Sequence, residues 1–463
     1  MPNLIESLHL QESLRSVLGE ASKFKFRHQV VAVHHLMSTA ADLLYIAPTG
    51  GGKTWVYLTA ALSQPTKTMV VIVPLMALRT DLVRRLDELE GTFSYEIWNG
   101  QQPGSDPQLL LVSVEAVTSV EFSTYVAQLW NRERLAWVVL DEVHLLLTET
   151  YRQALRRVLT LRKHTFPLLM LSASMPPALE DQLKEEISSK FVTLREPCNR
   201  PKLRYHVKIL QNLQEVHHTV CEETALAFNS LDPRERMIVY VSRKDDAETL
   251  NEMLDDQVTR RIHHSGMSAT EREKAAQDWR DGTARVMIAT KGFGVGVDFP
   301  HVRYIFHHGG SNSVLDYVQE SGRAGRDGDV AFCTLFTFLN FHRLIGRDQH
   351  PLKPLLGGDC IRQVISRVVD REVVLPCVLN SKYEQCQVCV EGNRESCFSI
   401  SCLGSSLTKF SFISALAERA SNEDVSPSAS LPSPSGERFD SQLSKITFSL
   451  KNNNLDNPQL RFQ

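Results

Sequence analysis

Short, continuous runs of apolar residues recur along the first part of the chain, at residues 43–46, 69–73, 109–112, 137–140 and 168–171. Amphipathic stretches, such as residues 80–90, lie between them. Because the apolar runs do not alternate with polar residues, both faces of each strand must be buried, as in a parallel sheet covered by helices. The pattern predicts an α/β domain over residues 1–198.

The same rhythm restarts further along the chain, with apolar runs at residues 237–241, 286–289, 304–306 and 332–336. It predicts a second α/β domain over residues 199–343, joined to the first by a polar segment at 195–201 that contains two prolines. A cysteine-containing domain is expected at 344–395. Residues 396–463 are rich in Ser, Pro and Asn and are expected to form a mostly disordered tail.

The 463-residue chain is 42% hydrophobic and 23% charged, which excludes a wholly disordered, collagen-like or coiled-coil protein. Its net charge of -3 neither favours nor excludes a polyanionic partner. Apolar runs fall short of the roughly 18 residues that a membrane span needs, and charged residues interrupt the N-terminus. We therefore expect an intracellular protein without a membrane partner.

A glycine-rich segment follows the first predicted strand and precedes a predicted helix. Glycine backbone N–H groups at a helix N-terminus can wrap a phosphate, a lysine can reach the β- and γ-phosphates, and a hydroxyl can hold Mg²⁺. These positions are Thr49, Gly50, Gly51, Gly52, Lys53 and Thr54. Ala47 stands where the general pattern has its first glycine. The alternative is an ordinary glycine-rich turn.

Two carboxylates, Asp141 and Glu142, follow the strand predicted at 137–140. Ligands of α/β folds bind at the carboxyl edge of the sheet, so this pair is expected to lie near the phosphate loop. Asp141 would hold Mg²⁺ and Glu142 would act as general base toward the attacking water. The alternative is a solvated acidic turn.

The second domain carries Arg323 and Arg326, three residues apart and therefore on one face if the segment is helical. They would stabilise charge on the transferred phosphoryl group from across an interdomain cleft. The alternative is a basic surface helix. Gly322 and Gly325 argue against it, because they destabilise a helix unless close approach requires them.

Taken together, these motifs resemble those of superfamily 2 helicases, and more narrowly the RecQ family of ATP-dependent 3′–5′ DNA helicases. The resemblance covers roughly residues 15–390. Further matching segments are residues 72–78, 172–174, 199–205, 263–268 and 289–298. It implies two tandem RecA-like domains and, as cofactors and partners, ATP, Mg²⁺, and single-stranded and tailed duplex DNA. A nuclear location is also implied.

The resemblance assigns further roles by position. Arg27 and Gln29 would contact adenine, although the run is one residue shorter here than in the family, and Asp298 would belong to the nucleotide site. His144, residues 172–174 and Gln319 would couple the nucleotide state to domain movement. The residues that would grip the backbone of the strand are Pro74, Arg79, Ser113, Ser242, Thr290 and Lys291.

Four cysteines at Cys360, Cys377, Cys386 and Cys389 end in the C-x2-C spacing of a tetrahedral structural Zn²⁺ site. RecQ-like proteins carry a zinc-binding domain at this place. The alternative is a set of free buried thiols.

The chain departs from the family at two places. Residues 144–151 offer only Tyr151 where the family has an aromatic-rich loop, and residues 392–463 are too few and too polar for the expected winged helix. The preferred hypothesis is a DNA helicase. Two alternatives remain: a nucleic-acid-binding ATPase without productive unwinding, and an RNA-directed helicase. The sequence identifies no protein partner.

Overall fold

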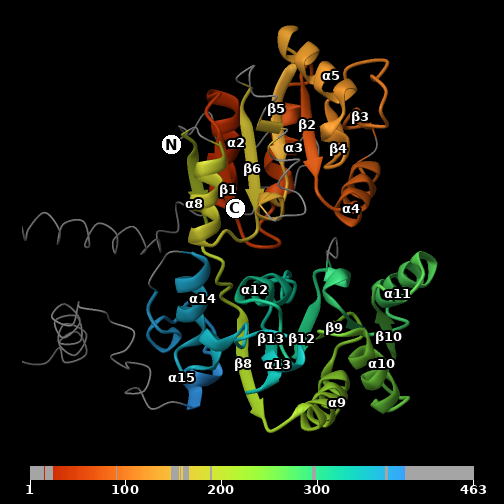
Figure 1. Cartoon of the computed structure of the whole chain (residues 1–463), viewed down its shortest axis with the longest axis vertical. Helices are drawn as coiled ribbons and strands as arrows, with labels where there is room; N and C mark the ends of the chain where they lie inside the picture. Colours follow the sequence, from red (N-terminus) through yellow and green to blue (C-terminus); the bar gives the residue numbers. More distant parts are fainter. Residues whose placement is uncertain are drawn as a thin grey trace, which may run out of the picture. The chain divides into compact units, whose positions relative to one another are not determined.

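The computed structural model describes residues 26–89, 91–147, 166–187, 190–294, 299–370 and 374–391, together with residues 15, 24, 156, 158 and 159 (Figure 1). The predicted tail and Asp298 lie outside these residues, as does Tyr151. None of the helices in the described part of the chain is long and apolar enough to cross a membrane.

The first sheet has seven parallel strands in the order β3-β4-β2-β5-β6-β1-β7. Their bounds are β1 Leu43–Ile46, β2 Thr68–Val73, β3 Tyr95–Ile97, β4 Leu109–Ser113, β5 Leu135–Leu140, β6 Leu168–Ser172 and β7 Val192–Arg195. Helix α2 Arg27–Ser38 precedes the first strand, and the helices between strands are α3 Lys53–Leu62, α4 Met76–Asp87, α5 Val120–Asn131, α6 Val143–Leu146 and α8 Pro177–Ile187, with a short 3-10 turn η1 at Ala116–Thr118.

Neighbouring residues of each central strand belong to different hydrophobic clusters. In β1, Leu44 and Ile46 pack into one core, whereas Leu43 and Tyr45 pack into the other. Because side chains alternate between the faces of a strand, both faces of this sheet are covered, which is what the continuous apolar runs predict.

The second sheet has six parallel strands in the order β10-β11-β9-β12-β13-β8. They are β8 Leu203–Leu210, β9 Arg236–Val241, β10 Arg260–His263, β11 Val286–Ala289, β12 Val302–His308 and β13 Ala331–Phe338. The connecting helices are α9 Leu213–Ser230, α10 Lys244–Met253, α11 Ala269–Asp281, α12 Val314–Ser321 and α13 Phe341–Leu344, with the 3-10 turn η3 at Lys291–Gly294. The predicted fold class, two RecA-like parallel-sheet domains, is confirmed.

The cysteine-containing segment consists of η4 Lys353–Leu356, α14 Ile361–Val369, η5 Cys377–Leu379 and α15 Gln387–Glu391. Its buried residues share one hydrophobic cluster with Leu203 and Tyr205 of β8, so its core is continuous with that of the second sheet. The domain boundaries expected from the sequence stay predictions.

Two local expectations need correction. The helix expected at 80–90 is α4, which already begins at Met76 and ends at Asp87. The segment expected as a linker from residue 195 begins later, because Arg195 pairs with Ile46 as the last residue of β7. A short edge strand with partly exposed residues lacks the apolar run that identifies buried strands.

Candidate nucleotide site

The phosphate loop lies between β1 and α3, and its backbone requires glycine. Gly50 and Gly52 have φ values of +76° and +70°, in the left-handed region that side chains disfavour. A Cβ atom on Gly51 would lie 2.7 Å from the carbonyl oxygen of Pro48. The loop therefore keeps a tight turn directly before the N-terminus of α3, where backbone N–H groups are available to an anion.

The side chains of Lys53 and Gln29 each donate a hydrogen bond to a backbone carbonyl oxygen of this loop. The Nζ of Lys53 donates to the carbonyl oxygen of Ala47 at 3.1 Å, and the Nε2 of Gln29 donates to that of Gly52 at 3.2 Å. The Oε1 of Gln29 accepts from the N–H of Phe26. Gln29 thus ties α2 to the loop, while Arg27 is exposed at the start of α2. Their predicted contacts with adenine stay predictions.

Asp141 and Glu142 follow β5 at the carboxyl edge of the first sheet. Burial and the neighbouring charge of Glu142 raise the pKa of Asp141 to about 7, although Lys53 counteracts them. A cation beside the carboxylate would relieve the same cost that protonation relieves, so Asp141 fits an Mg²⁺ ion. Glu142 has a φ of +45°, an unusual conformation for a residue other than glycine, and its Oε2 accepts a hydrogen bond from the N–H of Ala173 at 3.4 Å.

A chain of polar contacts links Glu142 to helix α12 of the second domain. The Nδ1 of His144 lies 3.4 Å from the Oε2 of Glu142 and 3.0 Å from the Oγ of Ser172. The Nε2 of Gln319, on α12, lies 3.0 Å from the Nε2 of His144 and donates to the Oγ of Ser174 at 3.1 Å.

These partners determine which ring nitrogen of His144 carries the hydrogen. Because the amide of Gln319 donates, the Nε2 of His144 accepts, and its Nδ1 carries the hydrogen toward Ser172. Burial lowers the pKa of His144, which favours this neutral form. The structure therefore brings together the two residues and the segment that the sequence assigned to coupling, namely His144, Gln319 and residues 172–174.

The two arginines do not lie on a helix, which corrects that expectation. Helix α12 ends at Ser321, and Gly325 takes a φ of +58° that stops helical propagation. Arg326 nevertheless lies against the phosphate loop, because a Cβ atom on Gly50 would be 3.4 Å from its Cγ. Arg323 lies beside the hydroxyl group of Tyr240 and acts to lower the pKa of that hydroxyl, which burial raises to about 12.

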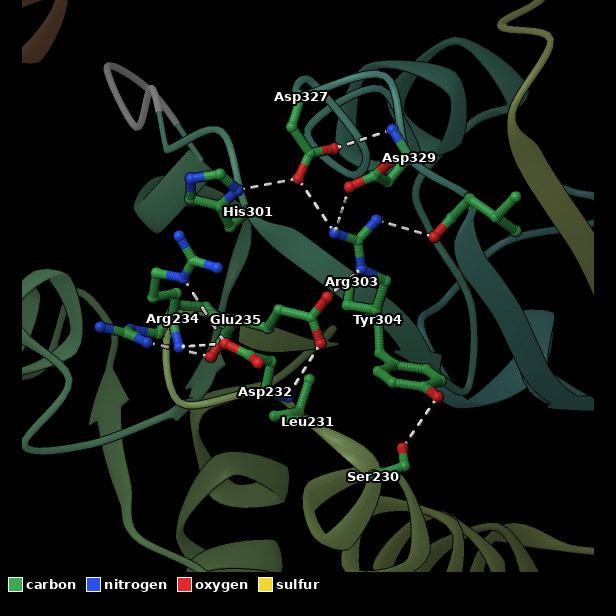
Figure 2. Close-up of polar contacts among 12 residues, drawn as sticks. Ser230, Leu231, Asp232, Arg234, Glu235, His301, Arg303, Tyr304, Asp327 and Asp329 are labelled. Carbon is green, nitrogen blue, oxygen red and sulfur yellow. Dashed lines mark hydrogen bonds and ion pairs between the residues drawn. The ribbon is translucent and has the colours of Figure 1, made fainter.

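Two anchors that sequence reasoning missed hold the arginine turn, residues 322–327. Arg200 donates to the carbonyl oxygens of Gly322 at 2.7 Å and Gly325 at 2.6 Å. Arg303 donates to Asp327 at 2.9 Å, and Figure 2 shows this contact beside the bond between Asp327 and His301. Arg200 stands within the family-like 199–205 run, which was the available signal.

The six residues predicted to grip a nucleic-acid strand line two hollows. Pro74, Arg79 and Ser113 line one of about 300 Å³ at the carboxyl ends of β2 and β4. The other, of about 270 Å³, lies at the second sheet and is lined by Ser242, Thr290 and Lys291. Arg272 and His263 also line the second hollow and were not predicted.

The cysteine cluster fits a tetrahedral metal. The Sγ separations are 3.8 Å for Cys360–Cys377, 3.6 Å for Cys377–Cys386 and 3.9 Å for Cys360–Cys386, and the Sγ of Cys389 lies within 4.8 Å of each. Four thiolates around Zn²⁺ at about 2.3 Å are spaced by roughly 3.8 Å. All four side chains are buried and none forms a disulfide bond.

Two family models match the chain. Residues 26–182 match the DEAD/DEAH box helicase model, and residues 216–328 match the helicase conserved C-terminal domain. These segments contain the first and second sheets respectively, apart from their outermost strands β7 and β8 and the last strand β13.

Three curated relatives of the chain are named as DNA helicases. The chain is 28% identical to mouse "ATP-dependent DNA helicase Q5" over 71% of its length and 35% of that protein. It is 29% identical to Arabidopsis thaliana "ATP-dependent DNA helicase Q-like 2" over 67% of its length and 46% of that protein. For Xenopus laevis "RecQ-like DNA helicase BLM" the identity is 27%, over 71% and 25%. The chain thus spans less than half of each of these relatives.

Solved helicases share the fold. The DUF1998 helicase MrfA bound to DNA has a TM-score of 0.60 at 17% identity, over 74% of this chain and 54% of that one. Mycobacterium smegmatis helicase Lhr, bound to single-stranded DNA and AMP-PNP, has a TM-score of 0.54 at 20% identity, over 70% and 47%. At these identities, the likeness extends to the fold alone.

Proposed function

Because the chain matches two helicase family models and is 27–29% identical to RecQ-type helicases over about 70% of its length, we propose that it is a RecQ-like helicase that hydrolyses ATP to move 3′ to 5′ along single-stranded DNA and to separate the strands of tailed duplexes. The proposal rests mainly on one contact, the 3.0 Å approach of Gln319 to His144. Through it, the second sheet touches the imidazole that lies beside the carboxylate of Glu142.

In the proposed reaction, the backbone of residues 49–52 and the ammonium group of Lys53 bind the phosphates of ATP. Lys53 must first leave the carbonyl oxygen of Ala47, which it contacts at 3.1 Å. Thr54 and Asp141 would hold Mg²⁺, which neutralises phosphate charge when bound. Glu142 would orient the attacking water and take its proton, because it directly follows Asp141 at the carboxyl end of β5.

Arg326 supplies positive charge to the transferred phosphoryl group. Its side chain already lies over Gly50, so a γ-phosphate held by the loop would meet it without rearrangement of the turn. Arg323 is the second cation of the turn. Arg200 and Arg303 are positioning residues, since Arg200 contacts Gly322 of the turn and Arg303 contacts Asp327 of the same turn, and neither of these contacts is to the phosphate loop.

A single strand would follow the two hollows, with its phosphates near Arg79 in the first and Lys291 in the second. Contacts of this kind go to the nucleic-acid backbone and carry little base preference. Lys291 is held in the structure by an ion pair with Asp316 of α12, the helix that also carries Gln319. Strand binding would therefore perturb the helix that contacts His144.

A second function, ATP-dependent nucleic-acid binding without unwinding, is favoured by the scarcity of aromatic residues at 144–151. A fluorescent strand-displacement assay separates the two. We expect the chain to displace a strand from a 3′-tailed duplex with ATP, but not from a 5′-tailed or blunt duplex, and Glu142→Gln to be inactive. ATP hydrolysis without displacement of any substrate would support the second function.

An RNA-directed activity is the remaining alternative from the sequence. Matched DNA and RNA oligonucleotides of one sequence provide the comparison. We expect DNA to raise ATP turnover more than RNA does. A larger effect of RNA would reassign the substrate without changing the motor residues.

A further inference from the structure

Three side chains converge in the second sheet domain at a place that the ATPase does not use. They come from different elements: His217 from α9, Asp246 from α10 and His308 from the end of β12. One ligand atom of each lies within 4.8 Å of the others. Helices α9 and α10 and strand β12 are labelled in the lower half of Figure 1.

The cluster leaves polar atoms unsatisfied. His308 is 1% exposed, and neither of its ring nitrogens has a hydrogen-bond partner. The Nε2 of His217 is also buried without a partner, and its 3.6 Å separation from the Oδ1 of Asp246 is longer than a hydrogen bond. Buried polar atoms are nearly always satisfied, so three such nitrogens around one carboxylate favour a bound group at this place.

We propose that His217, Asp246 and His308 bind a divalent transition-metal ion of the zinc type. Two imidazoles and a carboxylate are ligands that Zn²⁺ accepts, and the ion would bind the Nε2 of His217 and one ring nitrogen of His308. A tetrahedron with bonds of about 2.0–2.1 Å spaces its ligands by roughly 3.3 Å. The 3.6 Å pair is already close to that spacing.

The rings of His217 and His308 stack, with their centroids 4.7 Å apart and an angle of 20° between their planes. Because a metal ion lies near the plane of each imidazole that binds it, one of the two rings would turn about its Cβ–Cγ bond when the ion binds. Arg243 faces the other oxygen of Asp246 at 3.9 Å. Its guanidinium opposes a cation, but its side chain is 40% exposed and thus screened by water.

The ion would have a structural role. Asp246 lies in the first turn of α10, which Ser242 precedes, and His308 directly precedes Gly309 and Gly310. The Oγ of Ser242 donates to the carbonyl oxygen of Gly310, and both residues line the second hollow. A metal that joins α9, α10 and β12 would therefore hold the rim of that hollow in place.

Metal content tests the proposal. The full chain would be equilibrated with Zn²⁺, desalted and analysed for zinc, beside His217→Asn and His308→Asn. We expect each variant to hold about one equivalent less than the original chain. His350→Asn is the matched control, because His350 is also buried but both of its ring nitrogens have partners, Thr337 and the N–H of Leu352. It should keep the full zinc content.

Cobalt(II) provides a second measurement that distinguishes this site from the cysteine cluster. Thiolate-to-cobalt absorption in the near ultraviolet reports the cysteines alone. In His217→Asn, which replaces a side chain that is 14% exposed rather than fully buried, we expect that absorption to persist while one equivalent of cobalt is lost. Equal metal content in the folded variants and the original chain would overturn the proposal. ATP turnover does not enter either readout, so this failure would leave the helicase proposal standing.

Discussion

Lys53 and Asp141 lie at the same edge of the first sheet, and bound ATP with Mg²⁺ would change the hydrogen bond of the lysine and the protonation of the carboxyl group. Lys53 donates to a loop carbonyl oxygen, and the pKa of Asp141 is raised to about 7 by burial and by Glu142. A phosphate would compete with the carbonyl oxygen for the ammonium group of Lys53, and a cation would stabilise the carboxylate form of Asp141.

Replacement of Lys53 should abolish ATP turnover. In Lys53→Ala we expect kcat to fall by on the order of 100-fold or more, because a cation that contacts the transferred phosphoryl group is lost. Steady-state phosphate release measures this. Lys67→Ala is the control, since Lys67 is an exposed lysine outside the loop, and it should leave turnover unchanged. Similar rates in both variants would remove Lys53 from the mechanism.

The pKa of Asp141 predicts a pH dependence of stability in the nucleotide-free protein without Mg²⁺. A carboxyl with a pKa of about 7 when folded and roughly 3.9 when unfolded binds its proton more tightly in the folded state. Stability should therefore fall as pH rises from about 4 to 7. In Asp141→Asn we expect a shallower fall of the urea midpoint between pH 5 and 8. Parallel profiles of the two proteins would contradict the assigned pKa.

At the level of elements, the turn with Arg323 and Arg326 depends on residues far away in the sequence. Arg200 donates to two carbonyl oxygens of this turn. The buried guanidinium of Arg362 in turn donates to the carbonyl oxygens of Arg200 and Pro201 and so holds the backbone that carries Arg200. The cysteine-containing segment, which carries Arg362, therefore supports the arginine turn.

Removal of the Arg200 side chain should weaken both folding and catalysis. In Arg200→Ala we expect a loss of unfolding free energy on the order of 3 kcal/mol, since two charge-assisted hydrogen bonds are lost. We also expect kcat to fall about 10-fold with little change in KM. Arg204→Ala removes a half-exposed ion pair with Glu384 and a cation–π contact with the ring of Phe332, and it should cost about 1 kcal/mol. Equal effects of the two changes would refute the anchoring role.

The cysteine cluster should bind zinc and stabilise the second domain. In Cys386→Ser we expect the loss of about one equivalent of zinc and a lower thermal midpoint, because the cluster lies in the core shared with β8. Cys221→Ser changes a half-buried cysteine outside the cluster and should keep its zinc. If Cys386→Ser kept its zinc as well, the four-thiolate site would be wrong.

The sequence predicted the buried strands well, because residues such as those of β2 and β5 are apolar on both faces. It missed edge strands such as β3, whose residues are partly or fully exposed. The phosphate loop and the acidic pair were found because their residues are close in sequence. The Arg200 contacts and the His217–Asp246–His308 cluster were not, because they join residues from different elements that only the tertiary fold brings together.

In the whole molecule, the two sheet domains must act on one ATP molecule and respond to a nucleic-acid strand for the proposed motor to work. Within the described residues, Gln319 contacts His144 and Ser174 on the first sheet, and Arg326 lies against Gly50. A strand bound at the second hollow would act through α12, which carries Gln319 and is ion-paired to Lys291. We therefore propose that binding of the nucleic-acid strand is coupled to ATP hydrolysis through α12.

ATP turnover by the full chain, measured with and without single-stranded DNA, tests this claim most directly, with Gln319→Ala measured beside the original chain. We predict that DNA raises turnover at least 10-fold in the original chain. In Gln319→Ala, which should still bind ATP, most of that rise should be lost. Turnover that is indifferent to DNA in the original chain, or stimulated equally in both proteins, would contradict the account.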